Sequence, residues 1–292
     1  MNADYKIKGL FNQHLKIHLD ENNVSNNDNA QVFGQILNGN FDSPAFSYLE
    51  NLGFMRLHEV KSIGMYNELN LATKINERRD QEEILDESTV ELPKKMVKVN
   101  KNILSVLQQR HSSRDFNEIP MRQADFSTIV KYSFGLSGRV MSYDGVKAYS
   151  RFYASGGGLY PINIILQVNN VSGIKPGLYR YQPYSHTLYP YQKCLDIRKF
   201  LQYGSFDFDD YSFIVLLEYD LNRNYLKYGE LSLLTTMIEA GNISHNFELM
   251  CTAMDYSACQ IAGFNKHYAE EVLGLDGLNS HILFTVICGK EK

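Results

Sequence analysis

Runs of apolar residues mark the C-terminal two thirds of the chain as strands separated by helices. Three runs predict buried strands, at residues 162–168, 213–219 and 282–287. Between them, apolar residues recur at helical intervals, and the longest such stretch covers residues 231–254. This order predicts an α+β sandwich with a central mixed sheet and helices on both faces.

Weaker patterns fill in the remaining elements of this region. A hairpin is predicted at 179–182 and 188–191, and a strand with a turn at 257–264. Residues 137–150 are predicted to form a polar loop. Four further short helices are expected, at residues 100–109, 121–135, 196–203 and 267–273.

The first third of the chain differs in character. Residues 20–29 are rich in Asn and Asp, which predicts a loop or a disordered piece. Residues 90–95, Val-Glu-Leu-Pro-Lys-Lys, are predicted to be a linker because Pro93 would stop a helix. We therefore expect residues 1–95 to be a helical N-terminal extension that docks a partner or a peptide, and residues 96–292 to be the main domain. Helical patterns in the extension cover residues 11–15, 31–37, 45–57 and 69–85.

Composition narrows the class of protein. Hydrophobic residues make up 44% of 292, enough for a sizeable core, and the net charge of -4 argues against a nucleic-acid binder. No apolar run is long enough to span a bilayer, and a cytoplasmic location is expected. The four cysteines have no paired spacing and are predicted to be reduced thiols, while His111 and His267 lack a third ligand, so no metal site is predicted.

Residues 151–161, Arg-Phe-Tyr-Ala-Ser-Gly-Gly-Gly-Leu-Tyr-Pro, precede the first core strand. Three glycines permit a tight turn, and they also permit close approach of the backbone to a ligand. The flanking arginine and aromatic residues favour a ligand-contacting loop.

Residues 110–116, Arg-His-Ser-Ser-Arg-Asp-Phe, offer two arginines separated by hydroxyl groups. Forked guanidinium donors and serine hydroxyls match phosphate oxygens, so one interpretation is an anion site. The other is a solvated helix end in which Arg114 pairs with Asp115.

Taken together, the motifs resemble the SagB-type dehydrogenases of the FMN-dependent nitroreductase superfamily. The resemblance covers about residues 95–292 and lies in six signals that keep their order. These are Arg110-x-Ser-Ser-Arg114-x-Phe116, Ser155-Gly-Gly-Gly-Leu-Tyr-Pro161, Gly173-x-x-x-Gly177-Leu-Tyr-x-Tyr181, Lys227-Tyr228-Gly229, Glu239-Ala-Gly241, and Gly263-Phe264 with Leu273-Gly-Leu275.

This resemblance implies a nitroreductase-like FMN-binding homodimer that oxidises thiazoline or oxazoline rings to thiazole or oxazole in ribosomally made peptides. The azoline-containing precursor peptide and cyclodehydratase proteins are the implied partners. The lysine–tyrosine pair implies Lys227 and Tyr228 as catalytic residues. The implied FMN-binding residues are Arg110, His111, Ser112, Arg114, Ser155, Gly156, Gly157, Gly158, Gly263 and Lys290.

The sequence departs from the family pattern at three places. Ala154 replaces the usual proline, Asn242 replaces a histidine, and residues 231–234 lack the usual Gly-Tyr-Arg run, which leaves substrate or partner contacts of that helix open. Two other functions stay open as well. One is an NAD(P)H-dependent nitro- or quinone reductase, and the other is a non-catalytic scaffold subunit of a peptide-modifying complex. A surface lysine beside a packed tyrosine is the alternative interpretation of Lys227-Tyr228.

Overall fold

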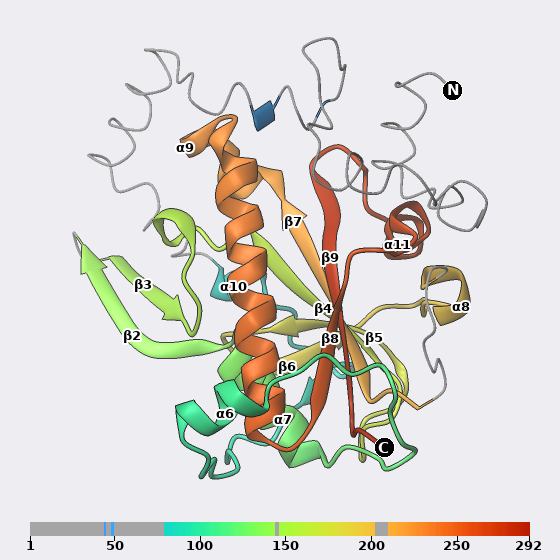
Figure 1. The fold of residues 1–292 in the computed structure, drawn as a ribbon. Coiled ribbons are helices and arrows are strands. Elements are labelled where there is room, and N and C mark those ends of the chain that lie inside the picture. The colour runs from blue at the N-terminus through green and yellow to red at the C-terminus, as the bar shows by residue number, and fades with distance from the viewer. Residues whose placement is uncertain (1–43, 45–47, 50–78, 144–145, 202–209) are drawn as a thin grey trace, which may run out of the picture. The chain divides into compact units, whose positions relative to one another are not determined.

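The computed structural model describes residues 44, 48–49, 79–143, 146–201 and 210–292 (Figure 1). The chain divides into two compact units, residues 1–56 and 57–292, and all the elements below belong to the second. The helices predicted at 11–15 and 31–37, the Asn-rich stretch, and nearly all of 45–57 lie outside the described residues, as does the start of 69–85. The end of that last pattern forms only the 3-10 turn η2, Asp80–Glu82.

A seven-stranded sheet forms the centre of the described fold. Its order is β1-β6-β5-β4-β7-β9-β8, and every described pairing in it is antiparallel. In that order the strands are β1 (Val90–Glu91), β6 (Thr187–Pro190), β5 (Gly177–Gln182), β4 (Ile162–Val168), β7 (Phe213–Asp220), β9 (Ser280–Gly289) and β8 (Ser257–Ile261).

The α+β fold with helices on both faces is therefore confirmed, but the expectation of a mixed sheet was wrong. The long connection between β7 and β8 runs through a helix and returns the chain parallel to β7. However, β9 lies between these two strands, so no parallel neighbours result. Strand order along the sheet depends on non-local pairing, which the apolar pattern does not specify.

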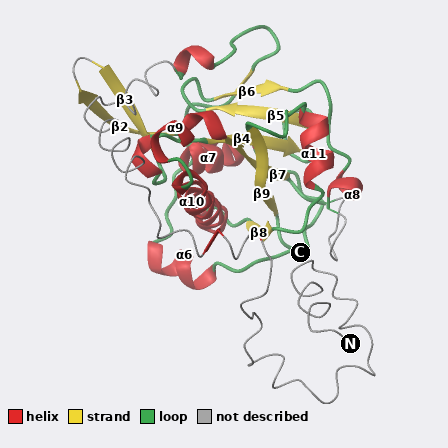
Figure 2. Cartoon of the chain, turned by 90° about the horizontal axis from the view of Figure 1, so that it is seen from above, coloured by secondary structure: helices red, strands yellow, loops and turns green. Residues whose placement is uncertain are grey.

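Helices cover the two faces of the sheet, as Figures 1 and 2 show. On one face lie α10 (Leu231–Ala253) and α7 (Gln123–Phe134), which contact each other. On the other lie α11 (Lys266–Leu273) and α8 (Ile197–Phe200). Two further short helices of the described fold are α6 (Ile103–Gln109) and α9 (Tyr225–Tyr228).

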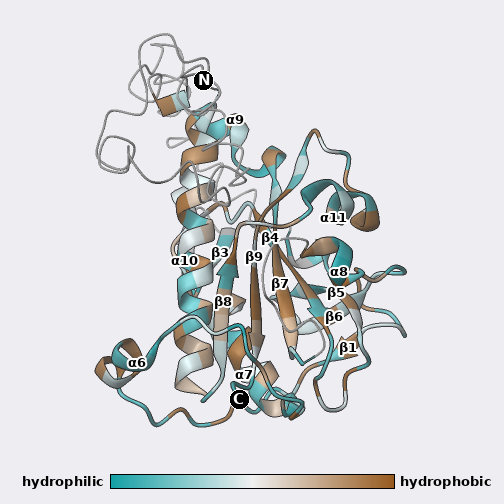
Figure 3. Ribbon diagram, turned by 45° about the vertical axis from the view of Figure 1, so that its right-hand side comes forward, coloured by the Kyte–Doolittle hydropathy of each residue, from teal (hydrophilic) through white to brown (hydrophobic). Residues whose placement is uncertain are grey.

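Both faces of the central strands are buried, so β4 and β7 are apolar almost throughout rather than alternating. Figure 3 shows these strands as hydrophobic through the middle of the fold. One core, around Phe213 and Phe247, packs under α7 and α10. A second, around Ile214 and Phe200, packs under α8 and α11.

Two segments differ from the sequence expectation. The predicted polar loop at 137–150 is instead a hairpin of β2 (Leu136–Tyr143) and β3 (Val146–Arg151), which pair with each other outside the main sheet. Its polar composition hid the strands because a two-stranded ribbon needs no buried face along its whole length. The predicted linker contains β1, whose Val90 lies opposite Leu188 at the sheet edge. Pro93 follows this strand, where a missing N–H costs no ladder bond.

Candidate functional site

The glycine stretch forms a single turn of 3-10 helix, η3 (Gly156–Gly158), immediately before β4. Gly157 and Gly158 both adopt positive φ, 62° and 66°, a backbone conformation that favours glycine. A Cβ atom on Gly158 would have no atom within 4 Å, so that face of the turn is open. A Cβ atom on Gly156 would lie 3.1 Å from Thr235 Cβ of α10.

Lys227 and Tyr228 lie directly against this glycine turn. A Cβ atom on Gly157 would stand 2.4 Å from Tyr228 Oη and 2.8 Å from Lys227 Nζ. Packing therefore requires glycine at position 157, as the positive φ also does, since only glycine leaves room for the side chains of Lys227 and Tyr228. Chain positions 157 and 227 meet because Ile162, at the start of β4, pairs with Tyr219, near the end of β7.

Helix α9 positions the lysine–tyrosine pair. The sequence indicated a loop after the strand, whereas the structure has this one-turn helix ending at Gly229, with φ of 53°. Asn224, at its start, is held by Tyr219 Oη at 2.9 Å and donates to Thr236 of α10 at 2.8 Å. These buried bonds fix α9 between β7 and α10.

Lys227 is only 7% exposed, which rules out the surface-lysine interpretation. Among the described residues its ammonium has no hydrogen-bond acceptor or ion-pair partner, and it lies 5.2 Å from the centre of the Tyr228 ring. Burial lowers the pKa of Lys227, because desolvation disfavours the charged form. Burial also raises the pKa of Tyr228.

Ser155 anchors the other side of the turn. Its hydroxyl donates to a carboxylate oxygen of Glu239 and accepts from the backbone N–H of Tyr160 at 2.8 Å. Glu239 is 1% exposed, and burial raises its pKa to about 7. The sequence shows the motif Glu239-Ala-Gly241, but the contact of Glu239 with Ser155 spans 84 positions, so no local pattern predicts it.

The predicted anion-site residues gather at the opposite end of the sheet. Ser112 forms an isolated parallel β-bridge with Ala258 of β8. The backbone N–H of the next residue, Ser113, donates to Ala258 O at 3.3 Å. Arg114 is exposed and interacts with the buried Cys259, and burial raises the pKa of that thiol. This region therefore begins at the end of α6, where Arg110 is the C-cap, and continues as a strand-like edge segment from Ser112.

The charges of this group already have neighbours. Arg110 approaches the buried Glu248 at 3.8 Å, beyond hydrogen-bond distance. His111 contacts Glu291 at 2.9 Å, and its pKa is raised by the hydrogen bond to Gln109 O and by this carboxylate. Lys290 donates to Asp255 O at 2.6 Å. Sequence reasoning missed Glu248 and Glu291, whose contacts also depend on long-range folding.

The two groups of residues lie apart within one chain. Thr235 faces the glycine turn and Glu248 faces Arg110, and these helix positions are 13 residues apart. At 1.5 Å per residue, this places them roughly 20 Å apart along α10. Gly263 follows the end of β8 that is farther from Ser112. The structure thus brings Lys227, Tyr228 and residues 155–158 together, and separately brings Arg110, His111, Ser112, Arg114 and Lys290 together.

The structure also describes the cysteines, the lengths of the helices and the grouping of possible metal ligands. Of the four cysteines, Cys251, Cys259 and Cys288 are buried and Cys194 is exposed, and all four are free in this structure. In the described part of the chain, no helix combines the length and the apolar character that crossing a membrane requires. No group of three or more His, Cys, Asp or Glu side chains placed to hold a metal ion occurs there either.

Comparisons with known proteins address the fold as a whole. The nitroreductase family matches residues 107–290. A Methanocaldococcus jannaschii protein named as a nitroreductase is 23% identical over 177 residues, which are 58% of this chain and 82% of that protein.

Solved structures support the same fold. A nitroreductase-family structure from Ralstonia eutropha superposes with a TM-score of 0.58 at 20% identity, covering 70% of this chain and 90% of that one. A chain of the Escherichia coli microcin synthetase McbBCD complex, solved with truncated pro-MccB17, superposes with a TM-score of 0.53 at 18% identity, covering 87% of this chain and all of that one. With the family matching more than half of its length, the chain belongs to the nitroreductase family of oxidoreductases.

Proposed function

We propose that this protein is an FMN-dependent dehydrogenase that oxidises thiazoline or oxazoline rings to thiazole or oxazole in a ribosomally made peptide. The observation that carries the proposal is the packing of Lys227 and Tyr228 against the glycine turn, with the lysine buried and unpaired within the described residues. The ordered motifs favour the same function. So does the likeness to a chain of the microcin synthetase complex, which extends over 87% of this chain.

Ring oxidation removes one proton and one hydride from adjacent ring carbons. A general base has to take the proton at the α carbon, and Lys227 can do so only in its neutral form. Burial lowers the pKa of Lys227 and so favours that form. Tyr228 keeps its proton because burial raises its pKa, so it can donate a hydrogen bond that orients the ring. Bound FMN would supply the acceptor for the hydride.

The residues present fit a flavin mononucleotide. Gly158 has an open face on a backbone that lacks side chains, and a planar ring can lie against such a surface. Arg110, Ser112 and Arg114 would hold the phosphate, with His111 and Lys290 adding positive charge nearby. His111 is suited to this because its pKa is raised toward the charged form.

A homodimer would join the two halves of the site. The glycine turn and the anion-site residues lie roughly 20 Å apart along α10 within one chain. In a two-fold dimer, the turn of one subunit can face the anion-site residues of the other. Exposed apolar side chains on neighbouring helices supply a surface for this contact. They are Leu226 of α9, Met237 and Ile238 of α10, and Ile103, Leu104 and Leu107 of α6.

We assign the N-terminal extension to docking of the precursor peptide or of cyclodehydratase partners. Residues 1–56 form a compact unit distinct from the oxidoreductase unit. The segment from Arg79 to Glu91 belongs instead with the main unit: Ile84 N–H donates to Gln182 at 2.7 Å, and Val90 pairs with Leu188. The docking role is therefore proposed for residues 1–56 in particular.

The test is an assay on purified, yellow protein with a peptide that carries one thiazoline. Under air and without NAD(P)H, the protein should convert the ring, and mass spectrometry should record the loss of two hydrogens per azoline. A nitro- or quinone reductase would leave the ring unchanged and would bleach its flavin with NAD(P)H. A colourless protein with no effect on the ring would indicate a scaffold subunit.

A further inference from the structure

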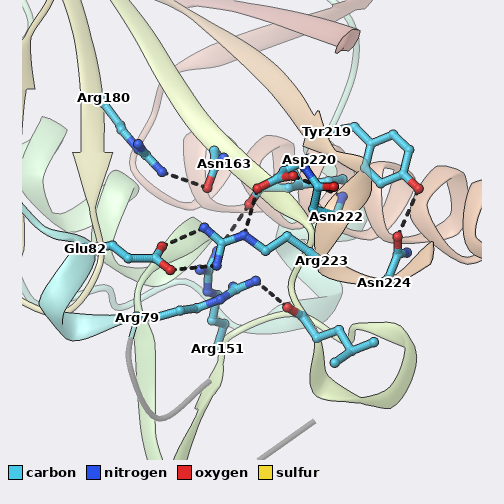
Figure 4. A network of polar contacts seen from close by, with 12 residues as sticks. Arg79, Glu82, Arg151, Asn163, Arg180, Tyr219, Asp220, Asn222, Arg223 and Asn224 are labelled. Carbon is cyan, nitrogen blue, oxygen red and sulfur yellow. Dashed lines mark hydrogen bonds and ion pairs between the residues drawn. The ribbon is translucent and has the colours of Figure 1, made fainter. Parts of the chain in front are cut away.

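A pocket lined by arginines lies behind the glycine turn and is not used by the proposed chemistry. Four arginines line it: Arg79 precedes η2, Arg151 ends β3, Arg180 lies on β5, and Arg223 belongs to the 3-10 turn η4 (Leu221–Arg223). Figure 4 shows their side chains converging from these separate elements. Segments distant in sequence have thus placed like charges together, which costs free energy unless anions compensate.

The carboxylates in the described residues compensate only part of this charge. Arg223 is already ion-paired, because it binds Glu82 through two hydrogen bonds of 3.0 and 2.6 Å and Asp220 through one of 2.9 Å. Glu83, the other acid lining the pocket, accepts backbone N–H groups of Tyr184 and Ser185 at 2.7 and 2.8 Å. Of these three carboxylates, only those of Glu82 and Asp220 accept hydrogen bonds from an arginine of the described structure, and both accept them from Arg223.

The remaining three arginines have only neutral hydrogen-bond partners in the described structure. Arg151 donates to Tyr153 Oη at 2.6 Å and Arg180 to Asn163 at 3.2 Å, while Arg79 donates to the carbonyl of Leu159. Glu218, opposite Asn163 on β7, lies near Arg180, but burial raises the pKa of its carboxyl and so disfavours its charge. Buried Glu239, near Arg151, is likewise shifted, to a pKa of about 7.

Arg79 gives independent evidence of a missing ligand. The residue is only 5% exposed, and its Nε–H group is buried with no hydrogen-bond partner among the residues that the structure describes. A buried donor left unsatisfied is costly, and buried charged groups are normally paired. Burial and the neighbouring Arg151 and Arg223 also lower the pKa of Arg79, to about 9. An anion in the pocket would accept a hydrogen bond from the Nε–H group and would stabilise the charged form of Arg79.

We propose that this pocket binds a single carboxylate group, held by Arg79, Arg151 and Arg180. Arg79, Arg151 and Arg180 have no carboxylate as a hydrogen-bond partner among the described residues, and guanidinium groups bind carboxylates through paired hydrogen bonds. The acidic side chains close by limit the net positive charge, which favours a monoanion over a phosphate dianion. The carboxylate could belong to a small organic acid or to an acidic side chain of a peptide. The pocket adjoins the active-site turn, since Arg79 binds Leu159 directly after Gly158. The proposal does not rest on the proposed function.

Calorimetric titration of the full-length protein with sodium acetate tests the proposal, with sodium phosphate at equal ionic strength as the comparison. Acetate should bind saturably and more tightly than phosphate. Arg180→Gln should weaken acetate binding about tenfold or more, the loss expected for one charge-assisted hydrogen bond. Arg180 is partly exposed, so this variant avoids the risk that Arg79→Gln, at a buried site, does not fold. Arg198→Gln, at an exposed position on α8, is the matched control and should bind as the wild type does.

A second titration separates the two sources of the carboxylate. A capped peptide with one glutamate is compared with the same peptide carrying glutamine. Tighter binding of the glutamate peptide than of acetate would identify a peptide ligand, and equal or weaker binding a small acid. The proposal is overturned if the wild type binds no carboxylate, if phosphate binds as well as acetate, or if Arg180→Gln leaves binding unchanged.

Discussion

At the scale of single residues, the site depends on side chains whose charge is disfavoured by burial. Lys227 is held without a carboxylate partner in the described structure, and Glu239 is held against Ser155. The residues themselves could be named from the sequence, because Lys227-Tyr228 and Glu239-Ala-Gly241 stand in order. Their environments could not, since the burial of Lys227 arises from β4, β7 and α10 meeting across the fold.

Glu239 should make folding stability depend on pH. Its pKa is about 7 in the folded protein and near 4.5 when exposed, so between these values the folded state holds a proton that the unfolded state has lost. The free energy of unfolding must therefore fall as pH rises from 4.5 to 7. Glu239→Gln keeps an acceptor for Ser155 but cannot ionise, and this fall should disappear.

Thermal unfolding of wild type and Glu239→Gln at pH 5 and pH 8 provides the measurement. The variant should gain stability relative to the wild type on going to pH 8. Glu271→Gln, at an exposed position on the outer side of α11, serves as the control and should keep the wild-type pH dependence. Identical pH profiles for wild type and Glu239→Gln would show that Glu239 does not titrate as its burial implies.

At the scale of elements, apolar runs located the core strands well. The strand predicted at 162–168 is β4, and the helix predicted at 231–254 is α10 within one residue. Such long, continuous patterns are specified locally. The polar hairpin β2–β3 and the two-residue strand β1 were missed because their pairing is set by partners elsewhere in the chain.

Helix α10 shows a further limit of the pattern. Ile238 and Phe247 both belong to its apolar pattern, yet Ile238 is 57% exposed while Phe247 is buried. The buried stripe instead includes polar residues such as Thr236 and Glu239, which contact α9 and the glycine turn. Met237, 52% exposed, and Ile238 form an exposed apolar stripe, which is therefore available to a second subunit.

Charged substitutions on that stripe should break the proposed homodimer. Met237→Lys with Ile238→Lys places two like charges on an exposed apolar surface of α10, which would be buried in the dimer. Light scattering should give a dimer for the wild type and a monomer for the variant, and the variant should lose its yellow colour. Leu278→Lys, on a loop residue that is 75% exposed, should remain a yellow dimer. A flavin-loaded monomer of the wild-type protein would contradict the proposed shared site.

At the scale of the whole molecule, the family and the α+β fold followed from the sequence. The separate roles of residues 1–56 and of residues 57–292 remain a prediction. Deleting residues 1–56 should spare FMN binding, because the described site residues and the sheet all belong to the second unit. It should slow oxidation of the full-length precursor while leaving a short azoline peptide unaffected. Absorption spectra measure the bound flavin, and oxidation rates are measured on the full-length precursor and on the short peptide. Loss of flavin on deletion would make residues 1–56 part of the cofactor-binding fold.

The central claim is that the buried lysine–tyrosine pair performs azoline oxidation on bound flavin. The most direct measurement is the mass of a thiazoline peptide after incubation with flavin-loaded wild type, Lys227→Ala and Tyr228→Phe, with Lys175→Ala, an exposed substitution between β4 and β5, as control. Wild type and control should remove two hydrogens per ring, and Lys227→Ala should be slower by about 10²–10⁴-fold, as expected for loss of a general base. Oxidation at near-normal rates by both flavin-loaded site variants would contradict the account.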